Sequence, residues 1–292
     1  MLELLTALAG QYRDDFRRAV IEAGLARAPV GMLLHAGDID PRPLRAADLL
    51  RCVPYYAESA FTAPLQRLAA GGWLEPAGGD AFRLTASGRA ATDRMYAAAR
   101  NRLAALSPMP PADLERLAGL LVRLFAACRR SRVVTDQACV EASGNAVAFT
   151  EPTALATIAR LLEALTNFRC DAHRAAWRPT GVDGPTWETL AWLCEGRADS
   201  AQALLEWAQK QPHPRAGAAA DYATCLKTLA ERGWAEPASG DGHYRLTGAG
   251  RQVRQRVEDQ TDDNFFSAWS ALSDGEVIEL TARSRAILDG LG

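Results

Sequence analysis

Few side chains in this 292-residue sequence have the chemistry and spacing of a reactive or ligand-binding site. Cys170 and His173 are the first candidates, because a thiolate and an imidazole three residues apart on a helix share one face and can bind one metal ion. The internal repeat described below aligns them with Asp14 and Arg17, which do not form the same pair. We therefore expect a hydrogen bond or ion pair on the helix surface, and no metal site.

Catalytic groups are not arranged as in the familiar enzyme classes. The four histidines occur on different predicted elements, and the sequence contains no nucleophile elbow and no glycine-rich phosphate loop. Gly78 and Gly79 are typical of a hairpin turn. We predict that the protein is not an enzyme and has no cofactor.

Charge and cysteine content narrow the class of protein further. A net charge of −2 and a pI near 6.1 give no overall attraction to nucleic acid, so DNA binding requires a local positive patch. Six cysteines without a C-x-x-C pair are typical of reduced thiols. We find no signal peptide and no membrane-spanning run, and we expect a cytoplasmic protein.

The strongest pattern in the sequence is an internal repeat. Residues 65–80 and 226–241 are identical at ten of 16 positions, and residues 82–89 and 244–251 at five of eight. Weaker similarity extends to both sides, where Asp15 and Arg18 correspond to Asp171 and Arg174. At i, i+3 spacing these two pairs are expected to brace helices rather than to catalyse. The repeated unit is long enough to be a whole domain, and we place the units at 1–130 and 151–292, with a linker at 131–150.

Each unit is predicted to begin and end with a helix and to carry three helices and a hairpin between them. Gly72 and Gly233 end the third helix, a tryptophan opens the first strand, and a glycine-rich turn joins the two strands. Thr85 can cap the helix that follows. Three helices followed by a two-stranded hairpin are typical of a winged helix. We expect these elements: helices at 2–23, 30–35, 44–51, 111–128, 153–177, 186–194, 200–209 and 274–288, and strands at 73–75 and 82–85.

At these residues each half resembles the MarR family of winged-helix proteins, whose subunits carry an L-x-x-L-x-x-x-G pattern, a wing, and an L-T-x-x-G-R start to a long helix. The second half also resembles, more loosely, an actinobacterial-type helix-turn-helix family through Arg169-x-Asp171-x-His173 and Gly181-x-Asp183-Gly184. The MarR resemblance implies a mainly α fold with small β-hairpin wings, in which two tandem units form a pseudodimer. The interlocked body would then comprise residues 1–23, 89–130, 153–178 and 251–290.

The wings depart from the MarR pattern. MarR-type wings usually carry an arginine that enters the minor groove, but the turns here read 77-AGGDA-81 and 238-ASGDGH-243, without arginine at either tip. Pro76 and Pro237 replace the positive residue that usually follows the first strand. The strongest DNA contacts of that family are therefore missing.

The exposed face of each third helix is the predicted DNA-reading surface. If Phe61, Leu65 and Leu68 form the buried stripe, the opposite face carries polar side chains suited to base edges and phosphates. A solvated helix face is the alternative. Between the second and third helices of unit two, an inserted loop with Lys210, His213 and Arg215 makes a small positive arm. The predicted DNA-binding residues are Ser59, Gln66, Arg67, Lys210, Arg215, Thr224, Lys227 and Thr228.

Tryptophan is concentrated in the second unit. Trp177, Trp187 and Trp192 have no equivalents in the first unit, and MarR-like regulators bind small aromatic effectors between the body and the winged helix. These three indoles therefore suit an effector pocket, and core packing is the alternative reading.

The leading hypothesis is a ligand-responsive transcriptional regulator, acting as a monomeric pseudodimer or a homodimer, that binds double-stranded DNA and a small aromatic effector and does not bind membranes. The alternative is a winged-helix module that has lost DNA binding and binds a small molecule or a protein. The acidic pI and the wings without arginine favour the alternative, whereas the repeated order of whole units favours the regulator.

Overall fold

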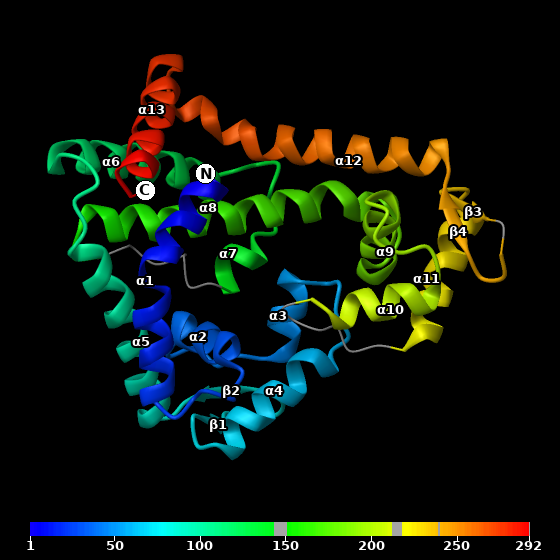
Figure 1. The fold of residues 1–292 in the computed structure, drawn as a ribbon, viewed down its shortest axis with the longest axis horizontal. Helices are drawn as coiled ribbons and strands as arrows, with labels where there is room; N and C mark the ends of the chain where they lie inside the picture. Colours follow the sequence, from blue (N-terminus) through cyan, green and yellow to red (C-terminus); the bar gives the residue numbers. More distant parts are fainter. Residues whose placement is uncertain (143–150, 212–217, 239, 292) are drawn as a thin grey trace.

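A computed structural model describes residues 1–142, 151–211, 218–238 and 240–291 (Figure 1). The chain is mainly α-helical and carries two small antiparallel hairpins, as the sequence predicts. The first half contains α1 (Leu2–Glu22), α2 (Val30–Ile39), α3 (Ala46–Cys52), α4 (Ser59–Ala70), β1 (Leu74–Pro76), β2 (Phe82–Leu84), α5 (Ala86–Ala104), α6 (Pro111–Arg129) and α7 (Ala138–Ala142).

The second half follows the same order after α7, with two added 3-10 turns. It contains α8 (Ala154–Trp177), η1 (Arg178–Thr180), α9 (Gly184–Cys194), α10 (Ala201–Gln209), α11 (Ala219–Glu231), β3 (Ala235–Pro237), β4 (Tyr244–Leu246), α12 (Gly248–Phe266), η2 (Ser267–Ala271) and α13 (Asp274–Leu291). Figure 1 shows the β1–β2 hairpin at one end of α5 and the β3–β4 hairpin at one end of α12.

Matching contacts form the junction between hairpin and long helix in both halves. The hydroxyl of Thr85 accepts a hydrogen bond from the Gly88 amide at 3.0 Å, and Thr247 caps α12 through Gly250 at the same distance. A Cβ at Gly88 would lie 2.2 Å from the carbonyl oxygen of Trp73, and one at Gly250 would lie 2.1 Å from that of Trp234. Glycine is therefore required where each long helix crosses the first strand of its hairpin.

An isolated β-bridge adjoins each two-stranded hairpin. Leu44 and Phe82 form an antiparallel bridge in the first half, and Ser200 and His243 form one in the second. Each bridge ties the segment before the helix-turn-helix to the second strand of the hairpin. Helices and hairpin therefore form one small unit in each half, which we call head 1 (residues 30–85) and head 2 (residues 184–247).

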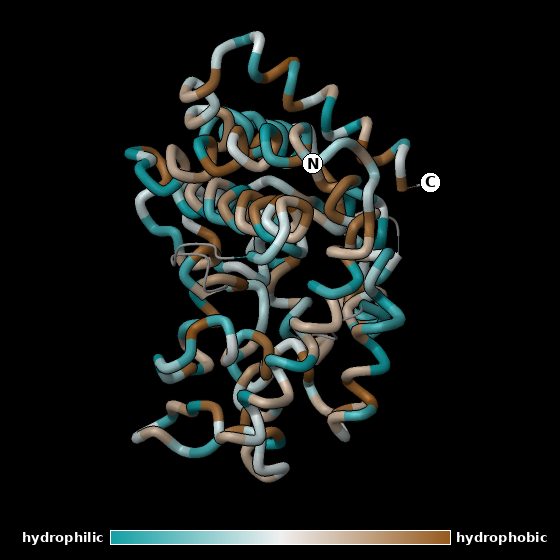
Figure 2. Tube along the Cα trace, turned by 90° about the vertical axis from the view of Figure 1, so that its left-hand side faces the viewer, coloured by the Kyte–Doolittle hydropathy of each residue, from teal (hydrophilic) through white to brown (hydrophobic). Residues whose placement is uncertain are grey.

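The two halves share one helical body. α6 packs along α8, α13 packs on α1, and α8 also contacts α12. One hydrophobic cluster includes Leu8 of α1, Leu121 of α6, Leu165 of α8 and Ile287 of α13, all fully buried. Figure 2 shows hydrophobic and hydrophilic residues alternating along the helices of this body, as expected for helices that bury one face.

Ion pairs join α6 to α13 across the body. Arg116 of α6 pairs with Glu279 of α13. Their nitrogen and oxygen atoms lie 2.8 Å apart.

The segment expected to be a linker is packed into the structure. α7 lies within residues 131–150 and contacts α3 and α8, and Cys139 and Val140 are buried. The described part of this segment therefore connects head 1 to the body through specific contacts. None of the helices in the described ranges is long and apolar enough to cross a membrane.

Candidate nucleic-acid interface

The third helix of head 1 has the two faces predicted from its sequence. Phe61, Leu65 and Leu68 are buried, at 4% exposure or less, which confirms the predicted stripe. The predicted reading residues Ser59, Gln66 and Arg67 are all exposed. Arg67 forms no ion pair with any described residue, so its guanidinium is available for a phosphate or a base edge.

The third helix of head 2 also has a buried face and a polar face, but the polar side chains already have partners within the helix. Thr224 and Lys227 are exposed and Thr228 is half-buried. Both threonine hydroxyls donate to backbone carbonyls of their own helix at 3.0 Å. The ammonium group of Lys227 lies 3.9 Å from the carboxylate of Glu231. These side chains must exchange weak local partners before they can contact DNA.

Both reading helices carry a carboxylate at the end that normally enters the major groove. Glu58 stands at the N-cap of α4, and Asp221 lies in the first turn of α11, where it accepts a hydrogen bond from the Ala218 amide at 2.7 Å. A carboxylate there stabilises the helix but repels DNA phosphates. The N-terminal end of each third helix is therefore less positive than the helix dipole alone would make it.

Arginines of the two wings are neutralised by neighbouring carboxylates. Arg83 pairs with Glu75 at 2.7 Å, and Arg245 pairs with Glu236 at 2.8 Å. At the tip of the first wing, Asp80 lies 3.7 Å from Arg45. Within the described residues, the wings thus offer paired charges in place of free cations.

The positive arm of head 2 is described only in part. Lys210 follows α10 and is exposed. His213 and Arg215 lie outside the described residues, so their places in the predicted arm stay predictions.

The structure brings two of the three predicted ligand-binding tryptophans together. Trp177 and Trp187 stack with ring centroids 6.1 Å apart and planes inclined by 7°, and both are buried. Trp192 belongs to a separate cluster, where its ring centroid lies 6.1 Å from that of Tyr222. The stacked pair fills the core between α8 and α9.

His173 has two hydrogen-bonding partners beside that stack. The indole N–H of Trp187 donates to Nε2 of His173 at 3.2 Å, and Nδ1 of His173 lies 3.0 Å from the hydroxyl oxygen of Thr261. An indole N–H can only donate, so the imidazole proton resides on Nδ1 and points to Thr261. Burial, with Arg254 and Arg169 nearby, lowers the pKa of His173 to about 4. His173 is half-buried and makes its hydrogen bonds to α9 and α12, not to a neighbour on the surface of its own helix as the sequence predicts.

No group of three or more candidate metal ligands from His, Cys, Asp and Glu occurs in the described ranges. Cys170 is exposed, whereas the ring of His173 is committed to Trp187 and Thr261. The two residues therefore face different surroundings.

A buried ionic cluster, not foreseen as a whole, holds head 1 on the body. Asp171 and Arg174 pair at 2.9 Å with side chains 0% and 2% exposed. Asp171 accepts hydrogen bonds from the Cys139 and Val140 amides at the start of α7, and Arg174 donates to the carbonyl of Arg51 at the end of α3. The ion pair thus provides hydrogen-bond partners for the amide groups at the start of α7 and for a carbonyl group at the end of α3. The repeated Arg-x-Asp-x-x-Arg pattern was the only sign of this cluster in the sequence.

Asp136 extends this cluster to the surface. Its carboxylate lies 2.9 Å from both Arg51 and Arg178 and 3.3 Å from Arg174. Partial burial acts to raise the pKa of Asp136, but these arginines outweigh it and lower the pKa below 3.8. One carboxylate therefore joins α3 to α8 and η1.

Head 1 also touches head 2 directly. A Cβ at Gly184 would lie 2.0 Å from the carbonyl oxygen of Pro54, so the backbone after α3 lies against the first residue of α9. The rings of Tyr55 and Trp177 lie 6.0 Å apart at the same contact. The two heads are thus held at one separation in this structure.

Comparison with known proteins places the chain in a family. A helix-turn-helix family matches residues 142–291, a region that includes α10, α11 and the second hairpin. Searches of curated proteins and of solved structures gave no significant match. The matched region covers just over half of the chain, and the protein belongs to this helix-turn-helix family.

Proposed function

We propose that the protein is a DNA-binding transcriptional regulator in which α4 and α11 read duplex DNA. The observation that carries this proposal is the exposed polar face on the third helix of each head, within a chain of the helix-turn-helix family. In this proposal Gln66, Arg67 and Lys227 contact base edges or phosphates, while Ser59, Thr224 and Thr228 add hydroxyl contacts. The protein binds and does not catalyse.

The proposal further treats the chain as two MarR-like units that arose by tandem duplication. The sequence repeat, the matching order of elements and the matching caps at Thr85 and Thr247 support it. The pairing of α6 with α8 and of α13 with α1 is the exchange of helices expected of a pseudodimer. One chain then supplies both heads, and their different reading residues suit an asymmetric DNA site.

A small aromatic effector completes the proposed regulator. The Trp177–Trp187 stack borders Tyr55 of head 1, next to the contact between Pro54 and Gly184. A ligand entering beside this stack must displace core packing and thereby move the two heads relative to each other. Ligand binding would thus shift the population of head separations that match successive major grooves.

The second candidate function is a winged-helix module that binds a small molecule or a protein and no longer binds DNA. It is favoured by the carboxylates of Glu58 and Asp221 at the ends of the reading helices. The paired wing arginines Arg83 and Arg245 favour it as well.

A salt titration of DNA binding separates the two candidates. Fluorescence anisotropy with a labelled random duplex, measured from low to physiological salt, should give an affinity that falls steeply with the logarithm of salt concentration. Binding to random sequence is sufficient, because phosphate contacts do not require the operator. Absence of binding at the lowest salt would overturn the regulator and leave the binding module.

A further inference from the structure

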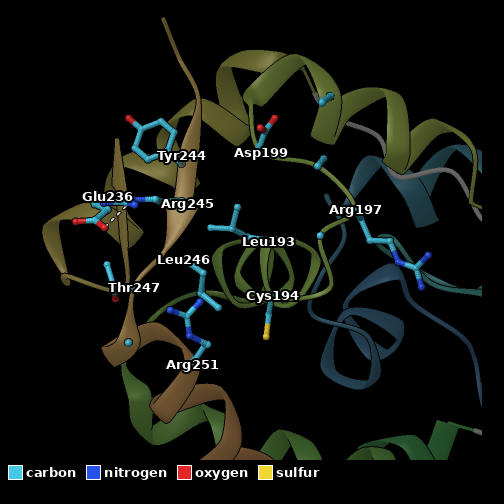
Figure 3. Close-up of a pocket in the computed structure, with 14 residues that line it drawn as sticks. Leu193, Cys194, Arg197, Asp199, Glu236, Tyr244, Arg245, Leu246, Thr247 and Arg251 are labelled. Carbon is cyan, nitrogen blue, oxygen red and sulfur yellow. Dashed lines mark ion pairs between the residues drawn. The ribbon is translucent and has the colours of Figure 1, made fainter. Parts of the chain in front are cut away.

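Head 2 has a groove of about 1050 Å³ away from the reading face of α11. Figure 3 shows it between the β3–β4 hairpin, the turn that follows α9 and the start of α12. Leu193, Tyr244 and Leu246 supply apolar surface to its walls, and Arg251 reaches it from the first turn of α12. The groove therefore offers an apolar lining with a cation at its edge.

Arg251 lacks the ion pair that the equivalent arginine of head 1 forms. Its equivalent in head 1, Arg89, donates two hydrogen bonds to the carboxylate of Asp40 at 2.8 and 2.9 Å. Glu195 follows α9 as Asp40 follows α2, but its carboxylate lies 3.2 Å from Arg197 and forms no ion pair with Arg251. The next residue, Gly196, lines the groove without a side chain. Arg251 is exposed and forms no ion pair with a described residue. The same arginine is thus tied to a carboxylate in one head and open to an incoming anion in the other.

Other charged groups of the groove are already neutralised. Arg245 pairs with Glu236 at 2.8 Å, Arg197 lies 3.2 Å from Glu195, and Asp199 lies 3.1 Å from His243. Figure 3 shows the Arg197 side chain extending away from the hairpin side of the groove. Among the described residues that line the groove, Arg251 is therefore the cation without a counter-charge.

We propose that this groove binds a small organic anion. Its carboxylate or phosphate group takes the place that Asp40 occupies beside Arg89 in head 1, and pairs with the guanidinium of Arg251. Its apolar part contacts Leu193, Tyr244 and Leu246. The site is distinct from the tryptophan stack and does not depend on DNA binding by the protein.

The test uses the full chain without DNA and two probes, hexanoate and inorganic phosphate, at constant ionic strength. Backbone amide shifts of Gly196 and Gly248, which line the groove, report binding by nuclear magnetic resonance. Arg251→Gln should raise the dissociation constant of the bound probe about ten-fold or more, because a charge-assisted hydrogen bond is lost. Arg89→Gln, the matched change in head 1, should leave it within about two-fold.

The two probes distinguish the source of the anionic group. Saturable shifts with hexanoate alone identify a carboxylate ligand with an apolar tail, and shifts with phosphate alone identify a phosphorylated one. Equal weakening by Arg251→Gln and Arg89→Gln, or no saturable shift with either probe in the wild-type protein, would overturn the proposal. Loss of DNA binding leaves this readout unchanged, so the two proposals fail separately.

Discussion

The same short pattern has opposite surroundings in the two leading helices. Asp15 and Arg18 of α1 lie 3.4 Å apart with side chains 37% and 68% exposed. Asp171 and Arg174 of α8 lie 2.9 Å apart with almost no exposure. The second pair is buried because α7 and the end of α3 cover it, whereas no described segment covers the first pair in this way.

This difference shows that the two halves are alike in local structure and unlike in position. α8 lies in the middle of the shared body and contacts α6, α7 and α12, whereas α1 lies toward its edge. An exposed ion pair contributes little to stability, but breaking a buried one leaves an uncompensated charge. The repeated sequence therefore specifies the helix and its ion pair, and the packing of the two halves determines whether that ion pair is exposed or buried.

The largest expected effect comes from breaking the buried pair. Arg174→Met removes the partner of Asp171 and the hydrogen bonds to the Arg51 and Asp136 carbonyls, and should lower the free energy of unfolding by about 3–5 kcal/mol. The matched change Arg18→Met should lower it by less than about 1 kcal/mol. Denaturant unfolding of both variants measures the contrast, and equal losses would contradict it.

Next in size is a pH effect confined to the second half. The pKa of His173 is about 4 in the folded protein against an ordinary 6.5, so between these values the unfolded chain binds a proton that the folded protein excludes. Stability from this group is complete above pH 6.5 and falls by about 3 kcal/mol as the pH drops to 4.

The variant His173→Gln should remove this part of the pH dependence while keeping a polar group beside Trp187. The corresponding residue of the first half, Arg17, is exposed, and Arg17→Gln should leave the pH profile unchanged. Unfolding curves at several pH values between 4 and 7 provide the measurement. A wild-type slope equal to that of His173→Gln would show that this histidine is not responsible.

A smaller effect is expected at the contact between the heads. Gly184→Ala drives a methyl group against the Pro54 carbonyl and should cost about 1–3 kcal/mol, with a change in the separation of the heads. Gly31, in the first turn of the equivalent helix α2, has nothing within 4 Å of an added Cβ, so Gly31→Ala should be neutral or slightly stabilising. Thermal unfolding and a spin-label distance between the heads check both changes.

The sequence predicted local structure well because local signals determine it. The glycines at 72 and 233 adopt positive φ after the third helices, the threonines at 85 and 247 cap the next helices, and the stripe at 61, 65 and 68 is buried. Turn, cap and helical-face rules act within a few residues, so they apply equally to both copies of the repeat.

Features that depend on packing between distant segments could not be predicted from the sequence. Residues 131–142 show no strong periodicity, yet they contain α7, which packs on α3 and α8 and donates two amide hydrogen bonds to Asp171. The sequence places Trp192 in one predicted pocket with Trp177 and Trp187, but in the structure Trp192 packs in a different cluster. The DNA-reading role of α4 and α11 stays a prediction, since burial alone does not decide what an exposed face binds.

Contact of both heads with DNA is tested most directly by the salt dependence of DNA binding in two variants. Arg67→Gln in head 1 and Lys227→Gln in head 2 should each reduce the slope of log affinity against log salt by about 1. Arg285→Gln, an exposed change on α13 of the body, should leave the slope unaltered. A slope that neither reading-helix variant changes, with DNA still bound, would contradict this account.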